Sequence, residues 1–443
     1  MNPLKTRTMT KHRVKVIGAG LAGCEAAWQL VSRGQAVTLY DMKPEQMSPA
    51  HNSALFAELV CSNSLRSDRL QNAVGLLKEE MRRLDSLIIK AADQARVPAG
   101  GALAVDREAF SGLITDTLKA HPLVDFVSEE VTEFPDAPAI IATGPLTSQP
   151  LSDAIMSLPE IGLLNFYDAA APIVMKDSID MSRAFKASRY DRGDDYINCP
   201  MDEQEYRAFH QALLTAETAP IHGFEESKVF EGCMPIESLA RRGEMAIAFG
   251  PLKPVGLKDP RTGRQPFAVL QLRRDDASDS MYNLVGFQTR LKFPEQKRVF
   301  GIIPGLENAQ FARYGVMHRN TFLNSPGFLD QHYQMLSRPG VFFAGQITGV
   351  EGYVESASSG LLCGLNMARQ LQGKAAISFP ASTAIGALAR YVATPNRHYQ
   401  PMNITFGLMD PLKLRVRGKE QRYLMLAEQA LNIIEDIKQT ELS

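Results

Sequence analysis

The chain has 443 residues, of which 45% are hydrophobic and 22% are charged, a composition typical of a soluble globular protein with room for two or three domains. Its 48 basic and 49 acidic residues give a formal net charge of -1, which excludes binding of a polyanion through overall charge, so such a partner needs a local basic patch. No apolar run reaches the roughly 18 residues that cross a bilayer, and we expect a cytoplasmic protein without a membrane partner.

The first predicted element is a β-strand that leads through a glycine turn into a helix. The segment Val14–Ile17 precedes glycines at 18, 20 and 23. Gly18 permits a tight turn, Gly20 lets a pyrophosphate approach the backbone, and Gly23 lets the helix lie close to the sheet. A helix over about Leu21–Arg33 directs its free N–H groups at the phosphates. We therefore expect an adenine-dinucleotide site here.

A second predicted strand, Val37–Tyr40, ends at Asp41, which lies 23 residues after Gly18. A carboxylate at this place can bind the ribose hydroxyls of the dinucleotide. The pattern alone does not distinguish FAD from NAD. Flavin reductases of the disulfide type usually carry a second fingerprint for their nicotinamide nucleotide, and this chain has one. We therefore expect FAD to be the bound cofactor and NAD(P)H to visit the open face of the flavin.

Two helices and a buried strand are expected next. Apolar residues at helical spacing predict one amphipathic helix over Ala73–Ala92, and a further helix at about Arg107–Ala120 follows a glycine pair. The segment 139–144 is expected to be a buried parallel strand that ends in a glycine turn. Short apolar strands ending in Ala-Thr-Gly are frequent in flavoproteins, so Gly144 is a candidate for the cofactor site.

The sequence pattern changes between about Leu151 and Leu329. Short segments rich in aromatic, proline and charged residues replace the regular alternation of predicted strands and helices. Residues 340–345 then restore a buried strand and a glycine turn. Such a turn, with Gly345 and Gln346, places a helix N-terminus near a flavin ring. Helices are expected after it at about 356–370 and 420–438.

This order predicts one domain interrupted by another. The fold class is α/β, with a Rossmann-like FAD-binding domain in two parts, 12–180 and 330–443, where the second part includes the C-terminal helix. A smaller inserted α+β domain at 181–329 is expected to bind the substrate.

Five cysteines are candidates for nucleophilic or metal chemistry. Their odd number and the absence of a CxxC pair argue against a disulfide framework and against a structural zinc site, and no metal is expected; they are Cys24, Cys61, Cys199, Cys233 and Cys363. Cys24 and Cys363 lie in predicted helices and are expected to pack in the core.

Cys61 and Cys233 have the more informative surroundings. Cys61 precedes Arg66 and Arg69, and arginines near a thiol favour the reactive thiolate, although a buried and inert cysteine is the more frequent case. Cys233 lies close to two glutamates, whose carboxylates disfavour a thiolate.

Basic and aromatic residues suggest contacts with other molecules. Tyr353, in a glycine-bordered loop, could stack on a flavin or on a base, or lie at the surface. Clusters of basic residues could line an RNA phosphate track or simply face solvent, and they are Arg66/Arg69, Arg82/Arg83, Lys253/Lys258/Arg261/Arg264, Arg273/Arg274, Arg290/Lys292/Lys297/Arg298 and Lys413/Arg415/Arg417/Lys419.

Seven stretches of the chain resemble the bacterial folate- and FAD-dependent tRNA (uracil-5-)-methyltransferases. They are GAGLAG, FAELVCSNSLRSD, NAVGLLKEEMRRLDSLIIKAAD, VPAGGALAVDRE, IIATGPLTS, FEGCMPIESLARRG and GQITGVEGYVESASSGL. The resemblance implies a fold like that of glutathione-reductase-type flavoproteins. It also implies that 5,10-methylenetetrahydrofolate supplies a one-carbon unit, that FAD reduced by NAD(P)H supplies electrons, and that the T-loop uridine of tRNA becomes 5-methyluridine.

The resemblance also assigns roles to residues. It implies that Cys61 and Cys233 take part in the reaction, that Tyr353 belongs to a loop beside the flavin, and that the FAD loop consists of Gly18, Ala19, Gly20, Leu21, Ala22 and Gly23. A thiolate that adds to C6 of uracil makes C5 nucleophilic. Either cysteine could attack, while the other assists proton removal or shields the flavin.

Three alternatives remain open at this point. The same chemistry could act on ribosomal RNA, because surface residues could change the target. An FAD-dependent oxidoreductase of a small metabolite would explain the fold and leave the cysteine motifs without a role. A non-catalytic flavin-bearing module that binds RNA would also fit.

Overall fold

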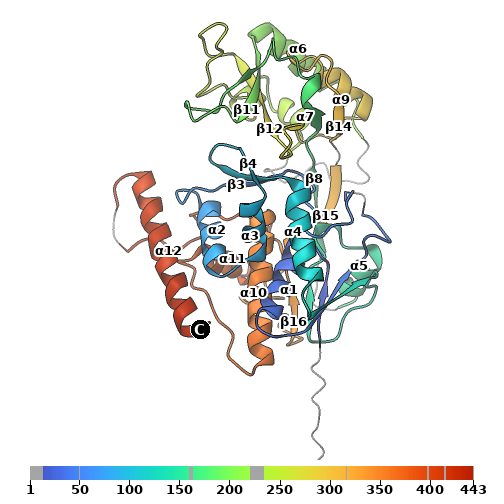
Figure 1. Cartoon of the computed structure of the whole chain (residues 1–443), viewed down its shortest axis with the longest axis vertical. Helices are drawn as coiled ribbons and strands as arrows, with labels where there is room; N and C mark the ends of the chain where they lie inside the picture. The colour runs from blue at the N-terminus through green and yellow to red at the C-terminus, as the bar shows by residue number, and fades with distance from the viewer. Residues whose placement is uncertain are drawn as a thin grey trace, which may run out of the picture.

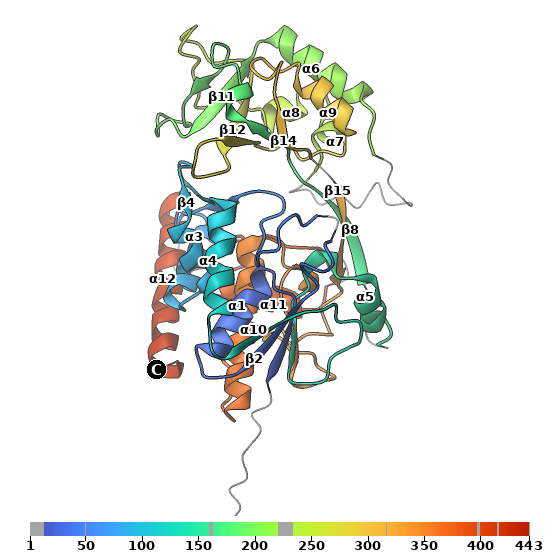
Figure 2. The ribbon, with the colours of Figure 1, turned by 45° about the vertical axis from the view of Figure 1, so that its right-hand side comes forward.

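The computed structural model describes residues 13–48, 50–158, 163–219, 234–315, 317–396, 399–413 and 416–442. Within these ranges the chain forms a larger lower body and a smaller upper body (Figure 1). Both the early and the late parts of the chain lie in the lower body, and the middle part forms the upper one, as the turned view also shows (Figure 2).

A parallel sheet forms the centre of the lower body, with the strand order β16-β7-β1-β2-β6. The strands are β1 Val14–Ile17, β2 Val37–Asp41, β6 Val124–Ser128, β7 Ala139–Ile141 and β16 Val341–Phe343. In β1, Val16 is aligned with Leu39 of β2 and with Ile140 of β7, and all three side chains are fully buried. The predicted early and late strands thus join one α/β sheet. Their carboxyl ends meet at one edge, where the glycine turns follow.

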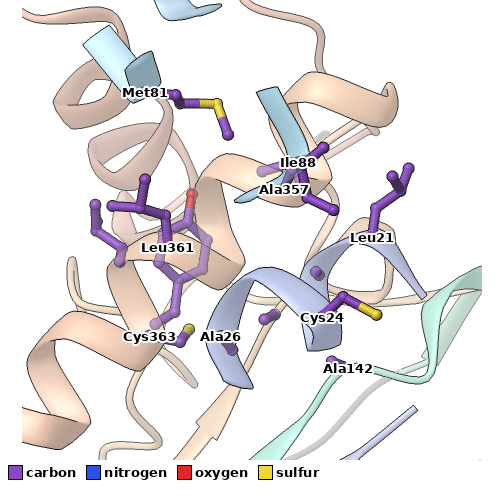
Figure 3. Packing of buried hydrophobic residues seen from close by; sticks show 14 of the residues in the cluster. Leu21, Cys24, Ala26, Met81, Ile88, Ala142, Ala357, Leu361 and Cys363 are labelled. Atoms are coloured by element: carbon purple, nitrogen blue, oxygen red, sulfur yellow. The ribbon is translucent and has the colours of Figure 1, made fainter. Parts of the chain in front are cut away.

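Helices pack around this sheet and bring distant parts of the chain together. They are α1 Leu21–Val31, α2 Ala73–Arg83, α3 Leu87–Gln94, α4 Arg107–Lys119, α5 Gln149–Met156, α10 Tyr353–Leu371, α11 Ala384–Ala393 and α12 Lys419–Glu441. Cys24 of α1 and Cys363 of α10 are fully buried in the same hydrophobic core, as expected (Figure 3).

The helix predicted over Ala73–Ala92 is wrong as a single element, because α2 and α3 are separate. Asp85 has a positive φ of 58°, which interrupts the helix, and the side chain of Ser86 then accepts a hydrogen bond from Ile89 N to begin α3. The Asp85 carbonyl instead accepts a hydrogen bond from Trp28 Nε1. The apolar residues keep their helical spacing across the break, so the sequence pattern alone does not reveal it.

The upper body has a sheet of the order β10-β11-β12-β13-β9-β14, in which neighbouring strands pair antiparallel. Its strands are β9 Ile173–Met175, β10 Phe185–Lys186, β11 Tyr196–Met201, β12 Ala268–Arg274, β13 Met281–Leu284 and β14 Phe311–Arg313. Its helices are α6 Glu203–Thr215, α7 Ile236–Ala240, α8 Ala246–Phe249 and α9 Phe293–Phe300. These elements enclose a second hydrophobic core, which contains Cys199.

Two small sheets connect the bodies. The chain leaves the lower body along β8 Leu163–Ala169 and returns along β15 Met317–Leu323, and these two strands pair antiparallel. A further sheet of β3 Ser64–Ser67, β4 Arg96–Val97 and β5 Ala102–Val105 faces the upper body (Figure 1). The domain limits at 180/181 and 329/330 stay a prediction.

Candidate functional site

A cleft opens at the carboxyl edge of the parallel sheet, with an empty volume of about 1110 Å³. Nine of the residues expected at the site line it: Gly18, Gly20, Leu21, Ala22, Asp41, Gly144, Gly345, Gln346 and Tyr353. The two other residues of the glycine motif, Ala19 and Gly23, are buried beneath the turn.

The amino-terminal glycine turn has the geometry that a pyrophosphate requires. Gly18 has a φ of +100°, and a Cβ atom there would lie 2.5 Å from the Ala142 carbonyl oxygen. A Cβ atom on Gly23 would collide with the carbonyl of Gly18, whereas no atom lies within 4 Å of the Cβ position of Gly20. Among the residues that the structure describes, no side chain caps the N-terminus of α1, so its first N–H groups are available to an anion. These residues fit a dinucleotide phosphate.

Asp41 lies at the end of β2 and fixes the glycine turn. Its Oδ2 accepts a hydrogen bond of 2.7 Å from Ala19 N, and its Oδ1 accepts one of 2.9 Å from Lys43 N. A carboxylate has about four lone-pair positions, so both oxygens can also accept ribose hydroxyls. The nearby Lys43 lines the cleft, and its Nζ donates to the carbonyl of Leu55 at 2.6 Å, on the segment that leads to Cys61.

Tyr353 connects the cleft with residues 59–63, which we call the Cys61 turn. It is the first residue of α10 and lines the cleft, and its Oη accepts hydrogen bonds from Cys61 N at 2.7 Å and from Ser62 N at 3.2 Å. Burial, together with the neighbouring Cys61 thiol, raises the pKa of Tyr353, so the phenol is neutral at physiological pH. Two segments nearly three hundred residues apart in the chain therefore meet at one wall of the cleft.

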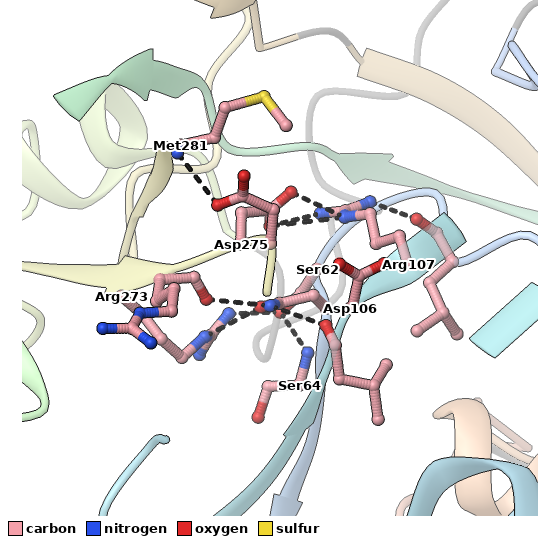
Figure 4. Close-up of polar contacts among 12 residues, drawn as sticks. Ser62, Ser64, Asp106, Arg107, Arg273, Asp275 and Met281 are labelled. Carbon is pink, nitrogen blue, oxygen red and sulfur yellow. Dashed lines mark hydrogen bonds and ion pairs between the residues drawn. The ribbon is translucent and has the colours of Figure 1, made fainter. Parts of the chain in front are cut away.

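Two arginines hold the Cys61 turn from the other side (Figure 4). Arg273, on β12 of the upper body, donates to Ser62 Oγ at 2.6 Å and to Asn63 Oδ1 at 3.0 Å. Arg107, at the start of α4, donates to the Leu59 carbonyl. The Arg107 guanidinium also forms an ion pair of 3.1 Å with Asp275, which follows β12. The turn is thus held between the two bodies.

A third arginine, Arg313, comes from the end of β14. Its Nη2 donates to the Ala50 carbonyl at 3.4 Å, and its guanidinium interacts electrostatically with Cys61 and Tyr353. Burial and the positive charge of Arg107 lower the pKa of Arg313. Arg107, Arg273 and Arg313 therefore place positive charge around the Cys61 turn, where it stabilises an anion.

Several arginines that the sequence offered for the Cys61 site or for RNA contacts form ion pairs or hydrogen bonds within the protein. Arg66 forms an ion pair with Glu355, a fully buried residue of α10. Arg82 forms ion pairs with Asp68 at 3.0 Å and with Asp93 at 2.8 Å. Arg273, grouped with Arg274 as a possible RNA contact, is 7% exposed and binds the Cys61 turn instead. The role expected of Arg66 and Arg69 at Cys61 stays a prediction, and Arg107, Arg273 and Arg313 are further cations close to the Cys61 turn.

One of the two candidate nucleophiles, Cys233, lies outside the described residues. Over the described ranges, no helix combines the length and apolar character needed to span a membrane. The same ranges contain no group of three or more His, Cys, Asp or Glu side chains placed to hold a metal ion.

Sequence reasoning missed several residues at the site. Besides Arg107 and Arg313, they include His51, which lines the cleft and whose Nδ1 lies 2.6 Å from Ser48 Oγ. Burial and the charge of Lys43 lower the pKa of His51. Arg107 lies inside one of the stretches that carry the family resemblance, which was the one signal that could have drawn attention to it.

Known proteins resemble this chain over nearly its whole length. The family model described as "Glucose inhibited division protein A" matches residues 13–375. A methylenetetrahydrofolate--tRNA-(uracil-5-)-methyltransferase TrmFO of Listeria monocytogenes is 61% identical over 96% of this chain and 98% of its own length. Proteins of the same name from Heliobacterium modesticaldum and Staphylococcus carnosus are 61% and 57% identical over 95% and 98% of this chain, and 97% and 100% of their own lengths.

Among solved structures, Aquifex aeolicus GidA in its form I crystal has a TM-score of 0.67 with 16% identity, covering 96% of this chain and 78% of its own. At this identity the likeness concerns the fold, and it agrees with the expected Rossmann-type α/β architecture. The matches in sequence extend further, because they cover most of the chain and of each relative. The chain belongs to the glucose inhibited division protein A family and, within it, to the methylenetetrahydrofolate--tRNA-(uracil-5-)-methyltransferases.

Proposed function

We propose that this protein methylates C5 of the T-loop uridine in tRNA, with 5,10-methylenetetrahydrofolate as the one-carbon donor and FAD, reduced by NAD(P)H, as the source of electrons. The observation that carries this proposal is the hydrogen bonding of Tyr353 Oη to the backbone of Cys61 at the wall of the dinucleotide cleft. This interaction holds a thiol, the kind of nucleophile that can add to uracil, next to the cleft that would bind the cofactor. The names of the relatives give methylenetetrahydrofolate and tRNA as the substrates of those proteins.

The cofactor is held, in this proposal, by residues of three glycine turns and one acid. The Gly18–Gly23 turn and the N-terminus of α1 would hold the pyrophosphate, and Asp41 would hold the ribose. Gly144 and the Gly345-Gln346 pair line the rest of the cleft and would lie along the flavin. Bound FAD supplies the two electrons that convert the methylene unit to a methyl group.

The chain's own residues prepare the uracil for this transfer. The Cys61 thiolate, or that of Cys233, adds to C6 of uracil, which forms an S–C bond and moves an electron pair onto the C4 oxygen. C5 then attacks the one-carbon unit and forms a C–C bond, and the C5 proton is removed. The bond between the one-carbon unit and the folate nitrogen breaks and releases tetrahydrofolate, two electrons and a proton convert the methylene to a methyl group, and departure of the thiolate restores the C5–C6 double bond. The arginines around the Cys61 turn stabilise the negative charge that develops on the uracil. Tyr353 keeps the cysteine in place.

The proposal is tested by incubating the FAD-loaded protein with methylenetetrahydrofolate, NADH and an unmodified tRNA transcript, followed by analysis of the nucleosides. We expect 5-methyluridine with this transcript and none when the T-loop uridine is replaced by cytidine. Cys61→Ala and Cys233→Ala should each lose activity at equal FAD content. Cys199→Ala is the control, because Cys199 lies in the core of the upper body. Full activity in both test variants would overturn the cysteine mechanism.

The same assay separates the alternatives. Methylation of a ribosomal RNA fragment in place of the tRNA would assign the chemistry to a different target. NADH oxidation that depends on neither RNA nor folate would indicate an oxidoreductase of a small metabolite. RNA binding without any folate-dependent product would indicate a non-catalytic module.

A further inference from the structure

Three aromatic rings of the upper body form a column whose outer end is open to solvent. Phe293 at the start of α9 stacks on Tyr314, with ring centroids 4.7 Å apart and planes inclined by 16°. Tyr314 in turn stacks on Phe311 of β14 at 4.9 Å and 10°. Phe311 and Tyr314 are half-buried, whereas the side chain of Phe293 is 51% exposed. An exposed phenylalanine held in a nearly parallel stack presents a flat face on which another ring can lie.

The column is linked to the Cys61 site through Arg313. Arg313 stands between Phe311 and Tyr314 in the chain, and its guanidinium reaches the lower body, where it donates to the Ala50 carbonyl and interacts electrostatically with Cys61. The next residue after Ala50, His51, lines the dinucleotide cleft. The strand end that carries the column thus also supplies a cation to the Cys61 site.

The surface next to Phe293 carries positive charge. Lys297, on the same helix, is exposed and forms no ion pair within the described part of the chain. Lys292 and Arg298 pair with Glu217 at 2.7 Å and Glu295 at 2.6 Å. Exposed pairs of this kind contribute little and can exchange partners. Phosphates that follow a stacked base would therefore meet cations on α9.

We propose that the Phe293–Tyr314–Phe311 column is a stacking platform for an unpaired nucleobase of the RNA, next to the reacting uridine. A single stacked face with cations beside it suits a base and its phosphate, whereas a protein partner requires a broader apolar surface. A stacking platform also suits a reaction at C5 and C6 of uracil. The reacting base must be unstacked from its neighbours in the loop before the enzyme can reach it, and the platform can hold a neighbouring base that loses its stacking partner. The identity of the RNA rests on the function proposed above.

The test compares Phe293→Ala, Phe293→Trp and Phe249→Ala in the FAD-loaded protein. Phe249, at the end of α8, is 78% exposed and serves as a control for loss of an exposed phenylalanine. Binding of a fluorescent T-arm hairpin is measured by anisotropy at several salt concentrations. We expect Phe293→Ala to weaken binding by about 5- to 150-fold, the ratio that ~1–3 kcal/mol per stacked base corresponds to. Phe293→Trp and Phe249→Ala should bind like the unaltered protein.

The salt dependence shows which kind of contact was lost. Loss of the stacking contact in Phe293→Ala should leave the slope of log Kd against log salt concentration unchanged, because the substitution removes no contact with a phosphate. An unchanged Kd in Phe293→Ala, in a protein that still methylates the hairpin, would overturn the platform and leave the proposed function intact. Weaker binding by Phe293→Ala in a protein that methylates no RNA would support the platform and overturn the proposed function.

Discussion

At the scale of single residues, one phenol holds the backbone of the Cys61 turn. Tyr353 Oη accepts from two consecutive N–H groups, those of Cys61 and Ser62. An N–H group that loses its buried partner costs ~1–3 kcal/mol. The orientation of the Cys61 side chain therefore depends on an oxygen atom contributed by α10.

Replacement of Tyr353 by phenylalanine removes this oxygen and keeps the ring. We expect methyl transfer to fall by about 10- to 100-fold, in proportion to the free energy of the lost hydrogen bonds, with little change in FAD content. Single-turnover formation of 5-methyluridine at equal flavin absorbance measures the effect. Tyr391→Phe is the control, because the hydroxyl of Tyr391 bonds the Gln400 carbonyl, away from the Cys61 turn. Equal rates for Tyr353→Phe and the unaltered protein would contradict this role.

A buried lysine should make stability depend on pH. Lys78 of α2 is fully buried, donates to the carbonyls of Leu65 and Ser67, and has its pKa lowered by burial to about 7. Between this value and the ordinary 10.5, the unfolded chain binds a proton that the folded protein does not. The free energy of unfolding therefore rises with pH over this window. As a neutral amine, Lys78 can still donate to both carbonyls.

Urea unfolding at pH 7 and at pH 9 tests this contribution. The gain in stability from pH 7 to pH 9 should be smaller in Lys78→Met than in the unaltered protein, because the variant has no amine to titrate. Lys90→Met is the control for removal of a lysine, because Lys90 is exposed on α3. The same gain in Lys78→Met and in the unaltered protein would show that Lys78 does not titrate in this window.

Much of the lining of the cleft could be predicted residue by residue, and the surroundings of Cys61 could not. The glycine motif and Asp41 are local, because a strand, a turn and a helix of known geometry fix their relative positions. Arg273 and Arg313 reach Cys61 only through the folding of a domain more than two hundred residues further along the chain. Spacing favoured Arg66, which the fold instead pairs with Glu355.

At the scale of elements, the cleft depends on how closely α1 and α10 approach. Helix α1 carries the glycine turn at its start, and α10 begins with Tyr353. A Cβ atom on Gly364 of α10 would lie 2.5 Å from the Ala26 carbonyl oxygen of α1. Any larger residue at this position must push the two helices apart, and with them the two sides of the site.

We therefore expect Gly364→Ala to destabilise the protein by ~1–3 kcal/mol, as overpacking usually does, and to lower FAD retention. Thermal unfolding together with the flavin absorbance of the purified protein measures both effects. Gly112→Ala is a matched control, because Gly112 is also helical, in α4, and no atom lies within 4 Å of its Cβ position. That control should be neutral or slightly stabilising, as alanine is favoured over glycine in helices. Equal thermal stability of Gly364→Ala and Gly112→Ala would contradict the packing argument.

Elements were predictable in type more than in extent. Apolar periodicity identified the helix that begins at Ala73, yet it could not locate the break, because Asp85 and Ser86 interrupt the backbone without interrupting the apolar stripe. Helix α10 begins at Tyr353, earlier than the expected start at 356, since the glycine-bordered loop joins the helix directly. Such boundaries depend on local backbone conformations that periodicity does not report.

At the scale of the whole molecule, Arg273 joins the upper body to the cleft. Its two hydrogen bonds to Ser62 and Asn63 cross between the bodies. Lysine at this position keeps a positive charge and loses the planar pair of donors. We expect Arg273→Lys to retain FAD and to lower the rate of methyl transfer about tenfold or more, since a buried hydrogen bond of a charged group contributes ~1.5–3 kcal/mol.

The neighbouring Arg274→Lys is the control, because Arg274 pairs with Asp279 within the upper body at 3.0 Å. The rate constant of methyl transfer under saturating RNA and folate, measured for both variants, separates the effect on the Cys61 turn from an effect on substrate binding. A rate in Arg273→Lys equal to that in Arg274→Lys would show that the contact between the bodies does not position the cysteine.

The sequence predicted that one domain interrupts another, because a second buried strand with a glycine turn appears after residue 340. The place where the chain crosses between the bodies could not be predicted from the sequence, because the pairing of β8 with β15 is visible only in the folded structure. An antiparallel pair brings residues far apart in sequence to within one strand spacing, and no local pattern marks such a pair.

That crossing has a practical consequence for engineering. Ala169 and Met317 are opposite each other in the β8–β15 pair, so the two ends of everything between them are already neighbours. A two-residue Asn-Gly turn could close these strands into a hairpin. A chain shortened in this way would test whether the lower body folds and binds FAD without the residues between these two strands.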